Sequence, residues 1–200
     1  MLMKGFAISS HSPAETSDPA SAPPPLGLIR EEEEEPTRTK HTEEGNMEDR
    51  WKKIWMELAF LFASRASGCS RGFVGAFVID PRNNPVSAGY NGGPRGAIGR
   101  LCGGEFCERS RSQIESGTQT EIGCHHAEAN ALMNAAHRGI SVAGCAMIVT
   151  TSPCLSCARL IHHAGIREVV TTLGYDGRGA TYLRNVGVEV SVTRLGDGEP

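Results

Sequence analysis

Two short stretches of the chain carry side chains that can hold a metal ion. His126 is followed two positions later by Glu128, and residues 152–157 carry Cys154 and Cys157 three positions apart. One histidine and two cysteines form a three-ligand zinc set, which leaves a fourth coordination position open for water, as in catalytic rather than structural sites. Glu128 can act on that water without being a ligand. The fold therefore has to bring two separate segments to one point.

Length and cysteine usage favour a single domain in a reducing compartment. Two hundred residues are enough for one domain with a buried core. Seven cysteines, an odd number that includes a metal-like pair, do not suit a disulfide framework. The N-terminus lacks the basic-then-apolar order of a secretory signal, and no apolar run approaches the ~18 residues that span a bilayer. We therefore expect a soluble, cytoplasmic protein without a membrane segment.

The first 46 residues differ in composition from the rest of the chain. They hold four Lys/Arg against nine Asp/Glu, are rich in proline, serine and alanine, and include the acidic run from Glu31 to Glu35. Such a composition predicts disorder. A solvated extension, a regulatory tail and a translation start at Met47 remain open as explanations. We expect a disordered extension at 1–46, a folded zinc-binding domain at 47–193 and a C-terminal tail at 194–200.

Hydrophobic periodicity predicts the order of secondary structure elements in the folded part. The expected helices are 48–66, 126–137, 153–164 and 176–185, and the expected strands are 73–79, 86–90, 146–150, 168–172 and 188–192. The first two strands form a hairpin. The last connecting helix is long enough for a right-handed crossover, so the fourth and fifth strands should be parallel. This order predicts an α/β domain with three layers, α/β/α, around a mixed five-stranded sheet.

Apolar spacing predicts which faces of two helices are buried. For the opening helix the expected buried stripe is Trp51, Ile54, Trp55, Leu58 and Phe62. For the helix that His126 begins, it is Ala129, Leu132, Met133 and Ala136. Both zinc-binding stretches should lie at helix N-termini, because Pro153 suits a first helical turn. The partial positive charge at a helix N-terminus helps keep thiols ionised for metal binding.

Residues 97–123 show no hydrophobic periodicity and are long for a loop in a compact domain. This length indicates a functional loop or a loop held by a local cross-link. Cys102 and Cys107 lie inside this stretch, and Cys124 and His125 follow it. These three thiols and one imidazole are candidates for a second, structural zinc site. Ordinary reduced cysteines in a surface loop are the alternative, since the spacing matches no standard zinc finger.

From about Trp51 to Val192 the chain resembles the deoxycytidylate (dCMP) deaminase family of the cytidine deaminase-like superfamily. The combination of H-x-E with P-C-x-x-C is typical of zinc-dependent nucleobase deaminases in general. The Ser-Gly-Cys-Ser-Arg run ending at Arg71 and the Gly-Tyr-Asn-Gly run at 89–92 narrow the resemblance to the dCMP branch. Further matching stretches are 55–59, 69–76, 89–96, 126–132, 152–159, 165–170 and 175–176.

The resemblance implies a cytidine deaminase-like fold and hydrolytic, zinc-dependent conversion of dCMP to dUMP and ammonia. Glu128 would carry protons from the zinc-bound water to the ring nitrogen and the departing amine. The resemblance also implies a homo-oligomer with dCTP and dTTP as allosteric effectors. The implied substrate contacts are Asn91 at the sugar, Arg71 at the phosphate, Tyr175 beside the site, and Ala127 and Ser152.

Three other functions remain open. A polynucleotide deaminase would show a basic groove with stacking aromatics, but residues 47–200 hold sixteen Lys/Arg against fourteen Asp/Glu and aromatics make up only 6% of the chain. A deaminase of modified dCMP, cytidine or guanine would share the zinc set without the nucleotide-specific stretches. A zinc-stabilised binding module would use the same metal ligands without a role for Glu128.

Overall fold

The computed structural model describes residues 46–93, 102–103, 106–115, 118, 122–172 and 177–193. The expected disordered extension, apart from its last residue, and the expected tail at 194–200 lie outside these residues. No helix in the described ranges is both long enough and apolar enough to cross a membrane.

The described elements follow the expected order, with one addition. In chain order they are α1 (Asp49–Ala66), β1 (Gly75–Ile79), β2 (Pro85–Tyr90), β3 (Cys102–Gly103), β4 (Phe106–Cys107), α2 (Glu108–Arg111), α3 (Ala127–His137), β5 (Ala146–Val149), α4 (Leu155–His163), β6 (Glu168–Thr171), α5 (Arg178–Asn185) and β7 (Glu189–Val192). The addition is β3, β4 and α2, which lie within the stretch at 97–123 that showed no periodicity. Strands of two residues and a helix of one turn are too short to leave a periodic signal.

Five strands form one mixed sheet in the order β2-β1-β5-β6-β7. Strand β1 is antiparallel to both β2 and β5, whereas β5, β6 and β7 run parallel to one another. The parallel pairing expected for the last two strands is therefore confirmed for β6 and β7. Because β1 reverses the direction twice, β2 and β5 point the same way, and their carboxyl ends lie at the same end of the sheet.

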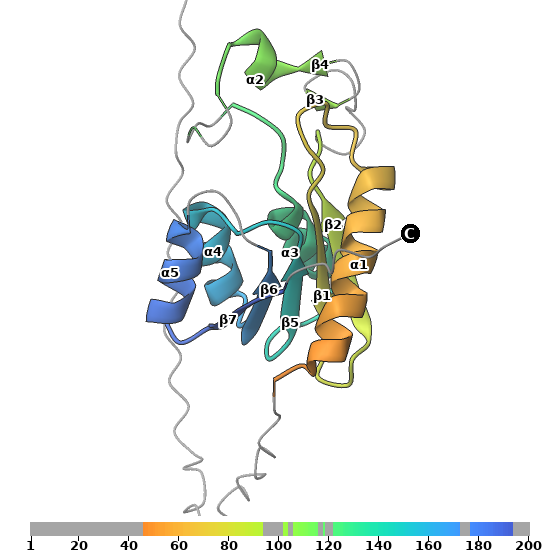
Figure 1. Cartoon of the computed structure of the whole chain (residues 1–200), viewed down its shortest axis with the longest axis vertical. Helices are drawn as coiled ribbons and strands as arrows, with labels where there is room; N and C mark the ends of the chain where they lie inside the picture. Colours follow the sequence, from red (N-terminus) through yellow and green to blue (C-terminus); the bar gives the residue numbers. More distant parts are fainter. Residues whose placement is uncertain are drawn as a thin grey trace, which may run out of the picture. The chain divides into compact units, whose positions relative to one another are not determined.

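Helices cover both faces of this sheet, which confirms the three layers (Figure 1). Helix α1 covers one face, where Met56 and Ala59 meet Ile79, Ile148 and Val170. Helices α3, α4 and α5 lie over the other face, against the alternate residues of the same strands: Val78, Met147, Val149 and Val169. Successive strand residues point to opposite faces, so short runs of consecutive apolar residues supply both cores.

The buried faces expected for α1 and α3 are partly wrong. In α1, Ile54 and Leu58 are 37% and 41% exposed, and in α3 Met133 is 57% exposed. The residues that are buried are Lys52, Met56, Ala59 and Ala63 in α1, and Ala127, Glu128, Ala131, Leu132 and Ala135 in α3. Both inner faces consist largely of alanine, which lets the helix backbone approach the sheet closely. Larger apolar residues in α1 lie at the flanks, where Trp55 and Phe62 contact the ring of Phe77.

A buried ion pair joins the start of α1 to β6. Glu168, the first residue of β6, is fully buried, and its Oε1 lies 3.0 Å from Nζ of Lys52. This contact is an ion pair without hydrogen-bond geometry. The backbone N–H of Met47 donates to the other carboxylate oxygen at 3.0 Å. The carboxylate therefore fixes the chain just before α1 as well as the helix itself.

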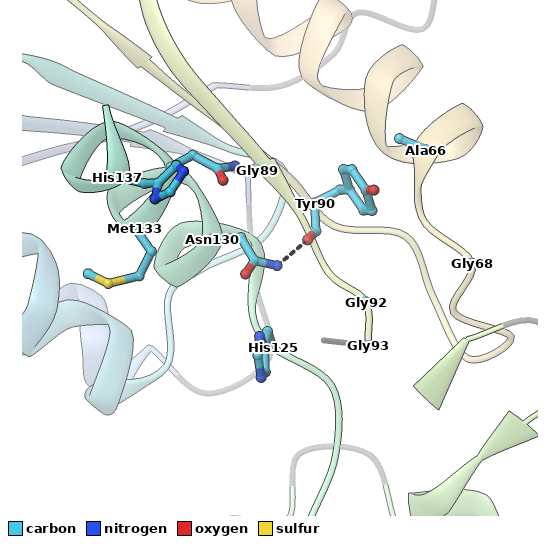
Figure 2. Close-up of a pocket in the computed structure, with 11 residues that line it drawn as sticks. Ala66, Gly68, Gly89, Tyr90, Gly92, Gly93, His125, Asn130, Met133 and His137 are labelled. Atoms are coloured by element: carbon cyan, nitrogen blue, oxygen red, sulfur yellow. Dashed lines mark hydrogen bonds between the residues drawn. The ribbon is translucent and has the colours of Figure 1, made fainter. Parts of the chain in front are cut away.

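Strand β2 lies at one edge of the sheet, beside α3. The side-chain amide of Asn130 donates to the carbonyl of Tyr90 at 2.7 Å, and that of Asn134 donates to Ala88 at 2.8 Å. Figure 2 shows the pocket next to this contact. The pocket has a volume of about 480 Å³ and is lined by Ala66, Gly68, Gly89, Tyr90, Gly92, Gly93, His125, Asn130, Met133, Asn134 and His137. None of His126, Cys154 and Cys157 lines it.

Candidate functional site

The three expected zinc ligands meet at the end of the sheet where β2 and β5 finish. Cys154 follows β5 and is the N-cap residue of α4. His126 is the N-cap residue of α3. Its neighbour His125 exchanges two backbone hydrogen bonds with Gly92, just beyond β2, at 2.8 and 3.1 Å. That bridge holds the start of α3 at the same end of the sheet as the start of α4. His126 and Cys154 therefore both lie at helix N-termini, as expected.

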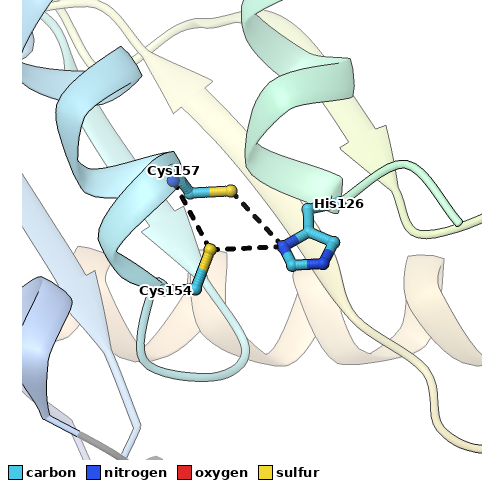
Figure 3. Close-up of side chains that lie close together, drawn as sticks. All are labelled: His126, Cys154 and Cys157. Carbon is cyan, nitrogen blue, oxygen red and sulfur yellow. Dashed lines mark hydrogen bonds between the residues drawn. The ribbon is translucent and has the colours of Figure 1, made fainter. Parts of the chain in front are cut away.

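The geometry of the three side chains suits tetrahedral zinc. Nδ1 of His126 lies 3.5 Å from Sγ of Cys154 and 3.5 Å from Sγ of Cys157 (Figure 3). Zinc bonds of ~2.3 Å to sulfur and ~2.0 Å to nitrogen at the tetrahedral angle give an S···N separation of about 3.5 Å. Within the described ranges, this is the only group of three or more His, Cys, Asp or Glu side chains close enough to share a metal ion.

The protonation of these side chains also fits a site for a cation. Hydrogen bonds, first from the Cys157 thiol and then from His126, lower the pKa of Cys154 to about 4. The hydrogen bond to Cys154 in turn raises the pKa of His126. The pKa of Cys157 is raised because its proton is held by Cys154. The Cys154 thiolate thus attracts two protons, one on Cys157 and one on His126. A divalent cation bound by all three side chains can replace both protons.

Glu128 lies beside this set without belonging to it. It occupies the first turn of α3 and is only 3% exposed. Its carboxylate lies within hydrogen-bond reach of Cys157, but it is not part of the three-residue metal group. Burial raises the pKa of Glu128. The structure therefore places a buried carboxylate with a raised pKa beside the three candidate metal ligands, as the H-x-E spacing predicts.

Asn91 does not present its amide to the site. It is 7% exposed, and its Oδ1 accepts hydrogen bonds from the Ser67 hydroxyl at 2.7 Å and the Val74 N–H at 2.8 Å. Its Nδ2 donates to the carbonyl of Gly72 at 2.9 Å. These bonds fix the turn after β2 against the segment that leads into β1. The contact of Asn91 with a sugar therefore stays a prediction, and its observed hydrogen bonds are structural.

The other expected substrate contacts differ in their surroundings. Ala127 is fully buried in the first turn of α3. Ser152, two residues before Cys154, is 9% exposed, and its buried hydroxyl has no hydrogen-bond partner among the described residues. The guanidinium of Arg71 donates to the carbonyl of Ile114 at 2.7 Å, which connects it to the segment after α2. Tyr175 lies outside the described residues.

Cysteines outside the zinc set form a second cluster, but not the one expected. Cys124 pairs with Cys69, whose pKa is lowered to about 5, chiefly by their mutual hydrogen bond. Cys107 is buried, and it lies close enough to Cys69 for the charge of a Cys69 thiolate to oppose ionisation of the Cys107 thiol. His125 is exposed beside the pocket instead. Cys107, Cys124 and His125 are not close enough to share a metal ion, and the side chain of Cys102 lies outside the described residues.

Sequence reasoning missed Arg109, in α2. Its guanidinium donates to the carbonyls of Glu115 at 2.8 Å and Thr118 at 2.9 Å. Its charge also reaches His126, where it opposes the larger effect of Cys154 on the histidine pKa. Arg109 is thus a cation near the zinc set that belongs to a stretch without periodicity. No spacing signal could have identified it.

Comparison with known proteins agrees with this geometry. Residues 49–173 match the family model described as "Cytidine and deoxycytidylate deaminase zinc-binding region". A deoxycytidylate deaminase of Mus musculus is 38% identical over 60% of this chain and 63% of its own length, and one of Enterobacteria phage T2 is 31% identical over 68% and 88%. The chain thus spans less than two thirds of the mouse protein, and the same holds for the deoxycytidylate deaminases of Schizosaccharomyces pombe and Homo sapiens, of which it spans 43% and 63%.

A solved structure shows the same likeness. The dCMP deaminase of the cyanophage S-TIM5, crystallised in complex with dCMP and dUMP, is 32% identical to this chain. Its TM-score is 0.61, and the match covers 74% of this chain and 99% of the phage protein.

Proposed function

The chain belongs to the cytidine and deoxycytidylate deaminase family, and on that basis we propose that it hydrolyses dCMP to dUMP and ammonia. The observation that carries this proposal is the set of His126, Cys154 and Cys157 with the buried Glu128 beside it. The similarity to deoxycytidylate deaminases, one of which was crystallised with dCMP and dUMP, supports dCMP as the substrate.

We propose the following roles for the chain's own residues. His126, Cys154 and Cys157 hold one zinc ion, which when bound makes water available as a nucleophile at neutral pH. Glu128 takes the first proton released from the water and delivers it to the ring nitrogen. It then takes the second proton, from the hydroxyl group that has added to the ring carbon, and delivers it to the departing amine, so that the ring carbon becomes a carbonyl and ammonia leaves. Ser152 binds the substrate. The observation that supports this role is its buried hydroxyl, which has no hydrogen-bond partner among the described residues.

A substrate panel tests the proposal. Ammonia release is measured with zinc-loaded protein on dCMP, CMP, dCTP, deoxycytidine and 5-substituted dCMP. We expect kcat/KM to be highest for dCMP. Higher kcat/KM for cytidine or a modified nucleotide would assign the site to another small-molecule deaminase. Bound zinc without turnover of any nucleotide would leave the binding module as the function.

Single-stranded DNA provides the test for a polynucleotide substrate. The expected result is no change of cytosine to uracil in the strand under conditions in which the same protein deaminates free dCMP. The near-neutral charge of residues 47–200 supports this expectation, because a strand-binding groove needs many uncompensated cations.

We extend the proposal to a second, structural zinc, held by Cys124 with cysteines of the neighbouring segments. The contact between Cys69 and Cys124 supports Cys69 as a ligand in place of His125. Replacing Cys124 with serine should lower both the zinc content and the melting temperature, because the metal contributes folding free energy. Cys145→Ala, which removes a buried thiol elsewhere in the core, is the control for zinc content. Unchanged zinc content in Cys124→Ser would leave the reduced-cysteine explanation.

We also propose that the protein is cytoplasmic, as its cysteine usage indicates, and that it is a homo-oligomer that responds to dCTP and dTTP, as the resemblance implies. Three apolar side chains on the outer face of α1 support an interface between copies: Ile54, Leu58 and Leu61, which are 37%, 41% and 56% exposed. Analytical ultracentrifugation measures the number of subunits in the assembly. Repeating it with dCTP and with dTTP shows whether either nucleotide changes that number.

We also propose that residues 1–46 are dispensable for folding and catalysis. A chain that begins at Met47 keeps all of α1, and its α-ammonium group can donate to Glu168 in place of the Met47 amide. We expect it to match the full chain in kcat/KM and in urea midpoint. A chain that begins at Lys53 is the matched control, because it loses Lys52 and the first turn of α1. Lower activity of the chain from Met47 would give the extension a functional role.

A further inference from the structure

Two glycines contact the two segments that carry the zinc ligands so closely that neither position has room for a Cβ atom. At Gly179, in the first turn of α5, a Cβ would collide with the carbonyl oxygen of Pro153 and lie 2.9 Å from that of Cys154. At Gly89, in β2, it would collide with backbone atoms of Ala127 and Ala131 in α3. Any side chain at either position therefore requires the backbone to move.

The contacts place these glycines on opposite sides of the zinc set. Helix α3 packs on β2, α3 contacts α4, and α4 contacts α5. The zinc ligands lie where α3 and α4 meet, with His126 beginning one helix and Cys154 the other. Gly89 therefore supports the start of α3 from one side, and Gly179 supports the start of α4 from the other.

Local backbone preference does not explain either glycine. Neither has a positive φ, so alanine could adopt both conformations. Alanine is also the better helix former at position 179, and glycine weakens a strand at position 89. The close contact is therefore the remaining physical reason for glycine at both positions.

We propose that Gly179 and Gly89 are positioning residues that fix the separation of Cys154 from His126 and thereby set the affinity for zinc. This inference rests on the proposed zinc site. Metal–ligand distances tolerate changes of only ~0.2 Å. A Cβ at position 179 has to displace its neighbours by more than that, because real Cβ atoms essentially never approach other atoms within 3.0 Å.

The displacement falls on Cys154 rather than on α5. Helix α5 is anchored in the core by Leu183, which is fully buried, and by Ala180, which is 7% exposed. Pro153 and Cys154 belong to an irregular connection between β5 and α4. The irregular segment yields first, and it carries the ligand.

The test compares zinc dissociation constants of the full chain by competition with a chromophoric chelator. We expect Gly179→Ala to bind zinc at least tenfold more weakly than the wild type, and Gly89→Ala to change in the same direction through His126. Gly72→Ala is the matched control, because Gly72 has an ordinary φ and nothing within 4 Å of its Cβ position. It should stay within twofold of the wild type. Affinity of Gly179→Ala within twofold of the wild type overturns the proposal.

Two further measurements separate this inference from the zinc site and from folding. Absence of tight zinc binding in the wild type would refute the zinc site itself, whereas the ratio of variant to wild type tests the glycines. Urea midpoints of the zinc-free proteins show whether Gly179→Ala acts on stability alone; a lower midpoint with an unchanged zinc affinity counts against positioning.

If Gly179→Ala does not fold, hydrogen exchange on the wild type decides. Because the first turn of α5 touches Cys154, zinc binding should slow amide exchange in residues 178–185 as well as in 154–163. Slower exchange in 154–163 alone would overturn the proposal.

Discussion

Glu128→Gln is expected to keep its zinc and its melting temperature while the rate of dCMP deamination falls by at least about a hundredfold. Glutamine has nearly the same size as glutamate and fits the same buried position in the first turn of α3. It cannot take a proton at neutral pH. General acid–base catalysis contributes ~100- to 10,000-fold in rate, or roughly 3–5 kcal/mol of barrier. Zinc content and ammonia release are measured on the same preparation.

Glu57→Gln provides the control for this substitution, because Glu57 is exposed on α1 and lies in no part of the proposed site. Its rate should equal that of the wild type. Two results would contradict the role of Glu128. Retention of most of the activity would remove it from proton transfer, and loss of zinc would make it a metal ligand instead.

Of the substitutions proposed for this protein, breaking the buried ion pair between Lys52 and Glu168 is expected to lower the free energy of unfolding most. Lys52→Met leaves the fully buried carboxylate of Glu168 with only the Met47 N–H as a partner. An unpaired buried charge costs about 3–5 kcal/mol, which is a large share of the ~5–15 kcal/mol that stabilises a domain. Urea unfolding of the zinc-saturated protein measures the change.

Lys53→Met is the matched control, because Lys53 is the next residue of α1 and is exposed. Its free energy of unfolding should change by less than ~0.5 kcal/mol. The second contact of Lys52, with Asp49 at 3.8 Å, contributes little because Asp49 is exposed to solvent. The double variant Lys52→Met/Glu168→Leu should recover much of the loss, since no charge is then left buried. A single variant as stable as the wild type would show that the pair is not a determinant of stability.

The meeting of His126, Cys154 and Cys157 and the layer order could be predicted because both depend on local patterns. Cys154 and Cys157 lie one helical turn apart, and H-x-E sets His126 and Glu128 on one first turn, so spacing alone places these side chains. The order of helices and strands likewise follows from periodicity. The structure brings the three ligands within metal-binding distance, as the pattern predicts.

The faces of α1 and α3 could not be predicted, because apolar residues surround much of both helices. The prediction placed the largest apolar side chains in the core. In the structure, several of the residues that face the sheet are alanines, which allow the helix backbone to approach the strands closely. Gly75 shows why, since a Cβ there would lie 2.5 Å from the carbonyl oxygen of Ala59. Such fits between distant backbones leave no periodic signal.

Distant side-chain partners were equally hidden. Nothing in the spacing of Cys69 connects it to Cys124, and only the fold brings the two thiols together. The hydrogen bonds that occupy the amide of Asn91 come from residues on the preceding segments, and no spacing in the sequence indicates them.

The asparagines of α3 have a consequence for how the protein behaves at high concentration. An edge strand with unpaired carbonyls is a template on which another chain can add a strand and start aggregation. Asn130 and Asn134 already occupy the carbonyls of Tyr90 and Ala88 on β2. The opposite edge, β7, has no neighbouring strand on its outer side within the described part of the chain. Intermolecular strand addition, where it occurs, should therefore begin at β7 and leave β2 unpaired.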